Sequence, residues 1–193
     1  ADVRPGAKTA REVLFIMVQV DLITGFLGAG KTTFLRRYVR YLVAQGHNVC
    51  ILENDFGAVN VDAMLLQDLI GEHCDIETIS GGCDCDTHQR RMRTKLISMA
   101  MRGFDRVVVE PSGIFDVDEF FDVLRDEPLD RWYTLGNVFA VVDAKLENEL
   151  SPQADYLLAS EAASAGLVVM SRTQLAAPGE AEAVIDHLNR ALA

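Results

Sequence analysis

The residues with the clearest chemistry in this 193-residue chain form a glycine-rich stretch, Gly25-Phe26-Leu27-Gly28-Ala29-Gly30-Lys31-Thr32-Thr33. Its spacing fits G-x-x-x-x-G-K-[ST], the phosphate-binding P-loop. Glycines let the backbone curl so that its N–H groups point at phosphate oxygens, and the N-terminus of the following helix adds positive potential. We expect Lys31 to reach the β- and γ-phosphates of a nucleotide and the Thr32 hydroxyl to bind Mg²⁺. The predicted nucleotide contacts in this stretch are Gly25, Gly28, Ala29, Gly30, Lys31, Thr32 and Thr33.

A second candidate site follows the apolar run at residues 107–109, where the chain continues Glu110-Pro111-Ser112-Gly113. Such a run is typical of a buried strand, and in P-loop enzymes an acid at this strand end lies beside the P-loop hydroxyl and holds Mg²⁺. That acid is usually Asp, whereas here it is Glu110. We expect Gly113 to let the backbone approach the γ-phosphate, so that the turn opens when this phosphate leaves.

Three further carboxylates, Glu53, Asp55 and Asp62, follow the second predicted strand. Ligands bind beyond such strand ends in open α/β sheets, and hard cations such as Mg²⁺ take oxygen ligands. We therefore place Asp55 in the catalytic set with Lys31 and Glu110, as part of a switch segment, and predict Asp62 as a further Mg²⁺ ligand. The alternatives are a solvated loop whose polar residues only shape turns, and Asp62 as the N-cap of the next helix.

A Cys-Asp-Cys-Asp stretch follows the third predicted strand. Thiolate suits Zn²⁺ or Cu⁺, and carboxylate or imidazole can complete the coordination of Zn²⁺. A structural zinc site normally has four ligands, so two thiols need partners. We predict Cys83, Cys85 and Asp86 as transition-metal ligands, with His88, Cys74 or the preceding carboxylates as further candidates. The opposing interpretation is an exposed glycine-rich turn with incidental thiols.

Strand and helix patterns alternate along the chain, which favours an α/β fold with a mainly parallel sheet and helices on both faces. With the P-loop between the first strand and the first helix, this is the pattern of a P-loop nucleoside triphosphatase. We predict one domain over residues 17–193 and a flexible extension over residues 1–16, which are polar and mixed. The patterns predict strands at 17–23, 49–52, 74–79, 107–109, 137–142 and 166–170, and helices at 33–44, 63–70, 87–101, 116–124 and 180–193.

The composition excludes several classes of partner. A net charge of −11 argues against a nucleic-acid surface, which would carry a basic stripe. No apolar run approaches the ~20 residues needed to span a bilayer, so we predict no membrane partner. Four cysteines without the spacing of a disulfide scaffold indicate a reducing compartment, and we predict a cytoplasmic protein.

Together these motifs resemble the CobW-like GTPases, relatives of the UreG, HypB and MeaB metallochaperone GTPases. The glycine-rich loop is similar to the Walker A motif of that family, and residues 110–113 to its Glu-x-x-Gly Walker B motif. Residues 53–57 resemble its Asn-Glu-Phe-Gly switch segment, with Asp62 matching a later Asp, and residues 80–85 resemble the start of its Gly-Cys-x-Cys-Cys metal motif. The resemblance implies a SIMIBI-type, Mg²⁺-dependent GTPase whose nucleotide state governs the delivery of a metal such as zinc to a client metalloprotein, often as a homodimer. The usual C-terminal domain of the family is not evident.

Two departures from the family's pattern bear on specificity. Asp86 stands where the metal motif has its third cysteine, which replaces a soft ligand with a hard one. Ser171-Arg172-Thr173-Gln174 replaces the guanine-binding Asn-Lys-x-Asp, and we still expect Ser171 and Arg172 to contact the nucleotide. Gln174 offers one acceptor oxygen, so it cannot repeat the bidentate pairing of Asp with guanine. GTP is the expected substrate, with ATP as the alternative.

Two other functions fit the same motifs. One is a nucleotide-dependent switch or scaffold for a partner enzyme, without metal transfer. The other is a small-molecule kinase, which we rank last because the sequence shows no acceptor pocket. Zinc bound at Cys83 and Cys85 in a nucleotide-dependent way would distinguish the metallochaperone from both.

Overall fold

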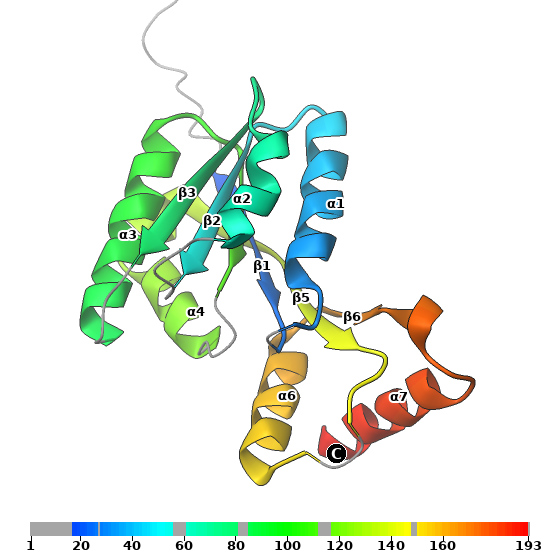
Figure 1. Ribbon diagram of the computed structural model, residues 1–193. Coiled ribbons are helices and arrows are strands. Elements are labelled where there is room, and N and C mark those ends of the chain that lie inside the picture. The colour runs from blue at the N-terminus through cyan, green and yellow to red at the C-terminus, as the bar shows by residue number, and fades with distance from the viewer. Residues whose placement is uncertain are drawn as a thin grey trace, which may run out of the picture.

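The computed structural model describes residues 17–26, 28–55, 61–80, 85–111, 117–147 and 150–192, and for residues 54, 55, 61–63, 80, 85 and 86 it describes the backbone only. The described strands form one six-stranded sheet of order β3-β2-β4-β1-β5-β6, in which every pairing is parallel (Figure 1). The predicted α/β fold is therefore confirmed. The strands are β1 (Val18–Thr24), β2 (Val49–Asp55), β3 (Cys74–Ser80), β4 (Arg106–Glu110), β5 (Tyr133–Asp143) and β6 (Leu167–Ser171).

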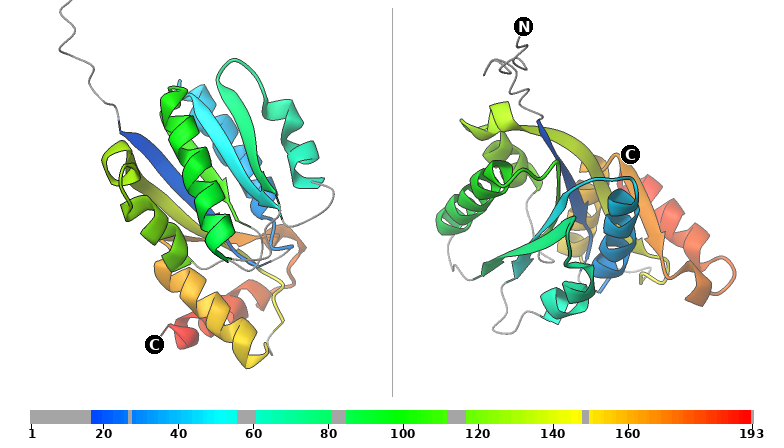
Figure 2. Two further views of the ribbon diagram at one scale, coloured as in Figure 1. Left: turned by 90° about the vertical axis from the view of Figure 1, so that its left-hand side faces the viewer. Right: turned by 90° about the horizontal axis from the view of Figure 1, so that it is seen from above.

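Helices cover both faces of this sheet, as the alternating patterns predict (Figure 2). On one face, α1 (Lys31–Ala44) and α2 (Val61–Leu66) pack apolar side chains such as Leu35 and Leu66 against the strands. On the other face, α3 (Cys85–Met101), α4 (Val117–Arg125) and the short α5 (Leu129–Trp132) contribute Leu96, Phe120 and Leu129 to a separate core. Because the middle of the sheet is covered on both sides, residues 107–109 of β4 and residues 138–142 of β5 are buried apolar runs.

A third, smaller core lies beside β5 and β6, where α6 (Pro152–Ser164) meets α7 (Glu180–Ala191). The sequence patterns predict α7 but not α6 or α5. Local signals for α6 are present: the Ser151 side chain accepts a hydrogen bond from the Ala154 N–H, and Pro152 occupies the first helical turn. The predicted helix over 63–70 is shorter, because it gives way to a 3₁₀ turn, η1 (Gln67–Leu69).

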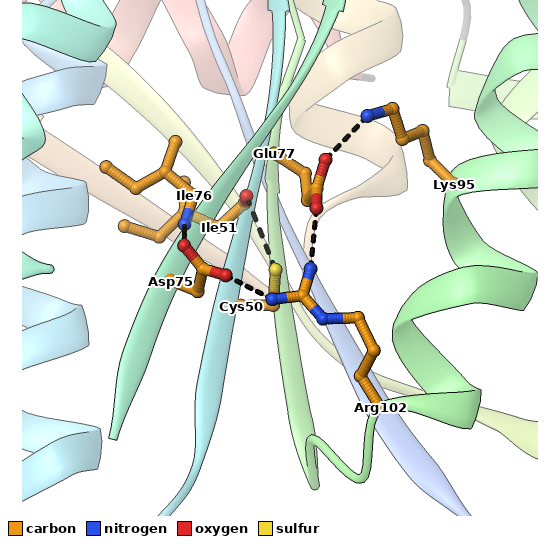
Figure 3. Close-up of polar contacts among 7 residues, drawn as sticks. All are labelled: Cys50, Ile51, Asp75, Ile76, Glu77, Lys95 and Arg102. Carbon is orange, nitrogen blue, oxygen red and sulfur yellow. Dashed lines mark hydrogen bonds and ion pairs between the residues drawn. The ribbon is translucent and has the colours of Figure 1, made fainter. Parts of the chain in front are cut away.

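Ion pairs tie the edge strand β3 to α3 (Figure 3). Arg102 pairs with both Asp75 and Glu77, and the Lys95 Nζ lies 2.5 Å from Glu77 Oε2. Beneath this network the Cys50 thiol is fully buried, and burial raises its pKa to about 12. Cys50 is thus a protonated core side chain.

Within the part of the chain that the structure describes, no helix is both long enough and apolar enough to cross a membrane. The predicted extension over residues 1–16 lies outside the described residues. The domain boundary at residue 17 therefore stays a prediction.

Candidate functional site

The glycine-rich loop joins the end of β1 at Thr24 to the start of α1 at Lys31, on the carboxyl edge of the sheet. Gly25 has a φ of +138°, and a Cβ atom there would lie 2.2 Å from the carbonyl oxygen of Val141. Gly30 has a φ of +95° and is the residue that precedes α1. Only glycine accommodates both the close approach at Gly25 and the left-handed backbone at Gly30 without strain, so the loop geometry explains the glycine spacing.

The Lys31 side chain points back along the loop. Its Nζ donates to the carbonyl oxygens of Gly25, at 2.8 Å, and Phe26, at 3.2 Å. The residue is only 7% exposed. A cation held at this position, together with the N-terminus of α1, makes the loop suited to an anion such as phosphate.

Thr32 and Glu110 meet beside the loop. The Thr32 hydroxyl donates to Glu110 Oε1 at 2.9 Å. Glu53 on β2 is the register partner of Glu110 on β4, and both carboxyl groups are buried. Hydroxyl and carboxylate oxygens are ligands that Mg²⁺ prefers, so this donor set fits the predicted magnesium site. The side chains of the predicted partners Asp55 and Asp62 are outside the described part of the structure.

The end of β6 contacts the other end of the loop. The Ser171 hydroxyl donates to the carbonyl oxygen of Ala29 at 2.6 Å, and Arg172 pairs with Asp143 at the end of β5. A cavity of about 180 Å³ lies here, and Phe26, Ala29, Asp143 and Arg172 are among its lining residues. The structure thus brings the predicted residues Ser171 and Arg172 to the P-loop, beside a cavity with an apolar wall and a charged pair.

The sequence patterns did not indicate that Glu161, on α6, contacts the end of β1 beside the loop. The Thr24 hydroxyl donates to its Oε1 at 3.0 Å, although the two residues are 137 positions apart. The residue is 5% exposed, on the same buried side of α6 as Leu158 and Ala162. Glu161 is the one acidic residue in the small and apolar stretch 157–163, and this is the signal that could have identified it.

The predicted transition-metal site falls largely outside the described residues. Cys83 is not among them, and the side chains of Cys85 and Asp86 are not described. Cys74 is the first residue of the seven-residue strand β3, whereas the Cys-Asp-Cys-Asp stretch follows the last residue of this strand. The two ends of the strand are about 20 Å apart. Cys74 is therefore excluded as a ligand to the same ion. His88 is buried on α3, and burial lowers its pKa.

Among the described side chains, no three of His, Cys, Asp or Glu are grouped so that they can hold a metal ion. Gly113, which we predict to approach the γ-phosphate, also lies outside the described residues. The cysteine site and the Gly113 turn therefore remain predictions.

Comparison with known proteins extends this picture. The sequence model of the CobW/HypB/UreG nucleotide-binding domain matches residues 19–192. The zinc chaperone YjiA of Escherichia coli (strain K12) is 33% identical over 183 residues, which cover 90% of this chain and 54% of that protein. The zinc-regulated GTPase metalloprotein activator 1 of Schizosaccharomyces pombe is 32% identical over 146 residues, which cover 72% of this chain and 35% of that protein.

A solved structure agrees with the sequence comparisons. The crystal structure of the Zn(II)-bound YjiA GTPase from E. coli superposes with a TM-score of 0.59 at 28% sequence identity. The match covers 89% of this chain and 54% of that one. The chain therefore spans about half the length of that relative and has the fold of a P-loop GTPase domain.

Proposed function

This chain belongs to the CobW/HypB/UreG family of nucleotide-binding domains, and from that premise we propose that it is a Mg²⁺-dependent GTPase that delivers zinc to a client metalloprotein. GTP binding is supported most strongly by the loop and its surroundings. The loop combines its glycines with a buried Lys31, and beside it Thr32 contacts Glu110. ATP is the alternative substrate, because Gln174 cannot form the bidentate pairing with guanine.

Each residue of the loop region has a defined role in this proposal. The backbone N–H groups of the loop and the Lys31 ammonium group bind the phosphates. Thr32 and Glu110 hold Mg²⁺, with Asp62 as a further ligand. When bound, this ion neutralises charge on the β- and γ-phosphates. The segments around Asp55 and Gly113 act as switches that follow the γ-phosphate.

The metal part of the proposal is supported by relatives named as zinc chaperones and by the thiols in the sequence. Cys83 and Cys85 bind zinc as cargo, with Asp86 beside them. Because thiolates are soft ligands, zinc is favoured over Mg²⁺ at this position. Nucleotide state alters the affinity for zinc, and a coupling of about 1–3 kcal/mol is typical between two such sites.

Nucleotide binding is tested with a fluorescent GTP analogue and a hydrolysis assay on the wild type and two variants. Lys31→Ala removes the cation within the loop and should abolish hydrolysis. Arg36→Ala is the matched control, because Arg36 is also a cation on α1 but pairs with Asp68 at 2.7 Å, away from the loop. Wild-type turnover in Lys31→Ala would show that the loop is not the catalytic site.

Zinc binding is tested by competition with a chromophoric chelator, in the presence of Mg²⁺ plus a non-hydrolysable GTP analogue and again without nucleotide. Tight binding should shift with nucleotide and disappear in the Cys83→Ser/Cys85→Ser variant. Cys74→Ala is the control, since this thiol lies at the opposite end of β3. Normal nucleotide binding with no zinc at these cysteines would favour the nucleotide-dependent switch or scaffold instead.

A further inference from the structure

A buried carboxyl group lies against the first residues of the P-loop. Glu161 extends from α6 and is 5% exposed, and its Oε1 accepts a hydrogen bond from the Thr24 hydroxyl at 3.0 Å. The backbone N–H of Gly25 lies close enough to this carboxyl group to oppose a rise in its pKa. Thr24 is the last residue of β1 and Gly25 is the first glycine of the loop, so Glu161 lies where the chain turns from strand to loop.

Gly25 is held from two sides. The Glu161 carboxyl group lies near its N–H, whereas the Lys31 Nζ donates to its carbonyl oxygen at 2.8 Å. Gly25 also has a φ of +138° and a close approach to the Val141 carbonyl, so its backbone has little freedom to shift. A change on the Glu161 side is therefore transmitted to the residue that Lys31 contacts.

The segment formed by α6 and β6 contacts the loop at both ends. Glu161 binds at the start of the loop, and Ser171 at the end of β6 donates to the carbonyl oxygen of Ala29 near its close, at 2.6 Å. These contacts join chain segments more than 130 residues apart. The geometry of the phosphate-binding backbone thus depends on an element outside the P-loop motif.

The surroundings of Glu161 act on its charge in opposite directions. Burial raises the pKa of its carboxyl group, while the Thr24 hydroxyl, the Lys31 charge and the Gly25 N–H oppose this rise. Its second oxygen, Oε2, is buried and has no hydrogen-bond partner among the described residues. A buried oxygen without a partner is tolerated more easily on a neutral carboxyl group than on a carboxylate. Glutamine keeps the length of the side chain and an acceptor oxygen for the Thr24 hydroxyl, so it is the substitution that disturbs this contact least.

We propose that Glu161 is a positioning residue of the nucleotide site, which sets the conformation at Gly25 and thereby the affinity of the loop for the nucleotide phosphates. It does not touch the nucleotide. The proposal rests on the proposed function, because it assumes that the loop binds a nucleoside triphosphate. It assigns to α6 a role in binding that the P-loop sequence alone does not contain.

The test measures the dissociation constant of a fluorescent GTP analogue, with Mg²⁺, for the wild type and three variants that probe this contact. Glu161→Ala removes both acceptors and should raise the dissociation constant by about tenfold, the effect of one or two lost hydrogen bonds. Glu161→Gln keeps an acceptor oxygen and should stay within about threefold of the wild type. Thr24→Val removes only the hydroxyl donor and should give an intermediate change.

Asp155→Ala is the matched control. Asp155 is a carboxylate on the same helix, but its partner is His187 on α7, at 2.6 Å, and not the loop. The melting temperature of each nucleotide-free variant is measured in parallel, so that affinities are compared among folded proteins. If Glu161→Ala does not fold, Glu161→Gln and Thr24→Val still report on the contact with a smaller disturbance.

The outcomes separate this inference from the proposed function. A wild type that binds no nucleotide overturns the proposed function and the positioning role with it. A wild type that binds nucleotide, together with an unchanged affinity in Glu161→Ala, overturns only the positioning role. Equal losses in Glu161→Ala and Asp155→Ala would assign the effect to general packing of α6 and would also overturn it, as would a tenfold loss in folded Glu161→Gln.

Discussion

The Thr32 hydroxyl donates to Glu110 Oε1 across 2.9 Å, which joins the first turn of α1 to the carboxyl end of β4. The sheet order explains this meeting, because β4 is the direct neighbour of β1, the strand that leads into the loop. Glu53 reaches the same edge from β2, in register with Glu110. A hydroxyl and two carboxyl groups thus lie together beside the phosphate-binding loop, from three separate parts of the sequence.

We predict that Thr32→Val reduces Mg²⁺-dependent hydrolysis. The variant keeps the shape of the side chain but removes the hydroxyl, so the hydrogen bond from Thr32 to Glu110 is lost and the metal loses a ligand. Loss of such a contact corresponds to roughly a ten- to hundredfold reduction in turnover at limiting Mg²⁺. A Mg²⁺ titration of the hydrolysis rate measures it, and Thr94→Val on the exposed face of α3 is the control. An unchanged Mg²⁺ dependence would argue against Thr32 as a ligand.

Gln174→Asp should increase the preference for GTP over ATP. Gln174 lies in the 3₁₀ turn η2 (Thr173–Leu175), directly after Arg172. A carboxylate there supplies two acceptor oxygens for guanine, where the amide supplies one. We expect the ratio of ATP to GTP dissociation constants to rise by about tenfold, measured by competition against a fluorescent nucleotide. Gln174→Ala is the control, and an equal ratio in the two variants would place base recognition elsewhere.

Gly25→Ala should disrupt the loop more than the same change at another left-handed glycine. The new Cβ atom would lie 2.2 Å from the backbone oxygen of Val141, which belongs to β5, a strand paired on both sides that cannot move aside. Gly46→Ala is the matched control, because Gly46 has a φ of +91° but no neighbouring atom within 4 Å of the place that a new methyl group would take. We expect Gly46→Ala to lower stability by about 1 kcal/mol and to leave GTP affinity unchanged. Gly25→Ala should lose at least about tenfold in affinity, and equal affinity losses in the two variants would contradict this account.

The fold and the core of the site could be predicted because their signals are local. The glycine spacing, Lys31 and Thr32 lie within nine residues, and apolar runs such as residues 107–109 are long enough to indicate buried strands. The position of Glu161 could not be predicted in this way. Its partner Thr24 is 137 residues away, and α6 mixes apolar and polar residues without a single apolar side. The register that places Glu53 beside Glu110 likewise depends on the pairing of β2 with β4.

Arg102→Met should lower stability at neutral pH, with an effect that diminishes in acid. Arg102 forms ion pairs with Asp75 and Glu77, which both lie on the edge strand β3 (Figure 3). Its guanidinium carbon also lies 5.0 Å from the centre of the Phe104 ring. Because Asp75 and Arg102 are more than a third exposed, solvent screens the pairing, and we expect a loss of about 1 kcal/mol in total. For a chain of this length that corresponds to a fall in melting temperature of roughly 2–4 °C.

The pKa of Asp75 gives the direction of this pH dependence. Burial alone would raise that pKa, but the hydrogen bonds from Arg102 and the Ile76 N–H, together with the Arg102 charge, lower it below the ordinary value of 3.8. A carboxyl group whose pKa is lowered by folding contributes stability above its unfolded pKa and loses it as the pH falls through the folded one. Urea denaturation at pH 7 and at intervals between pH 5 and pH 3, values chosen to bracket the carboxyl range, should therefore show the wild type and Arg102→Met converging below about pH 4. Arg125→Met, which removes a pair that is about three-quarters exposed, is the control and should change stability little at any pH. A difference between the wild type and Arg102→Met that stays constant down to pH 3 would assign it to the Phe104 contact.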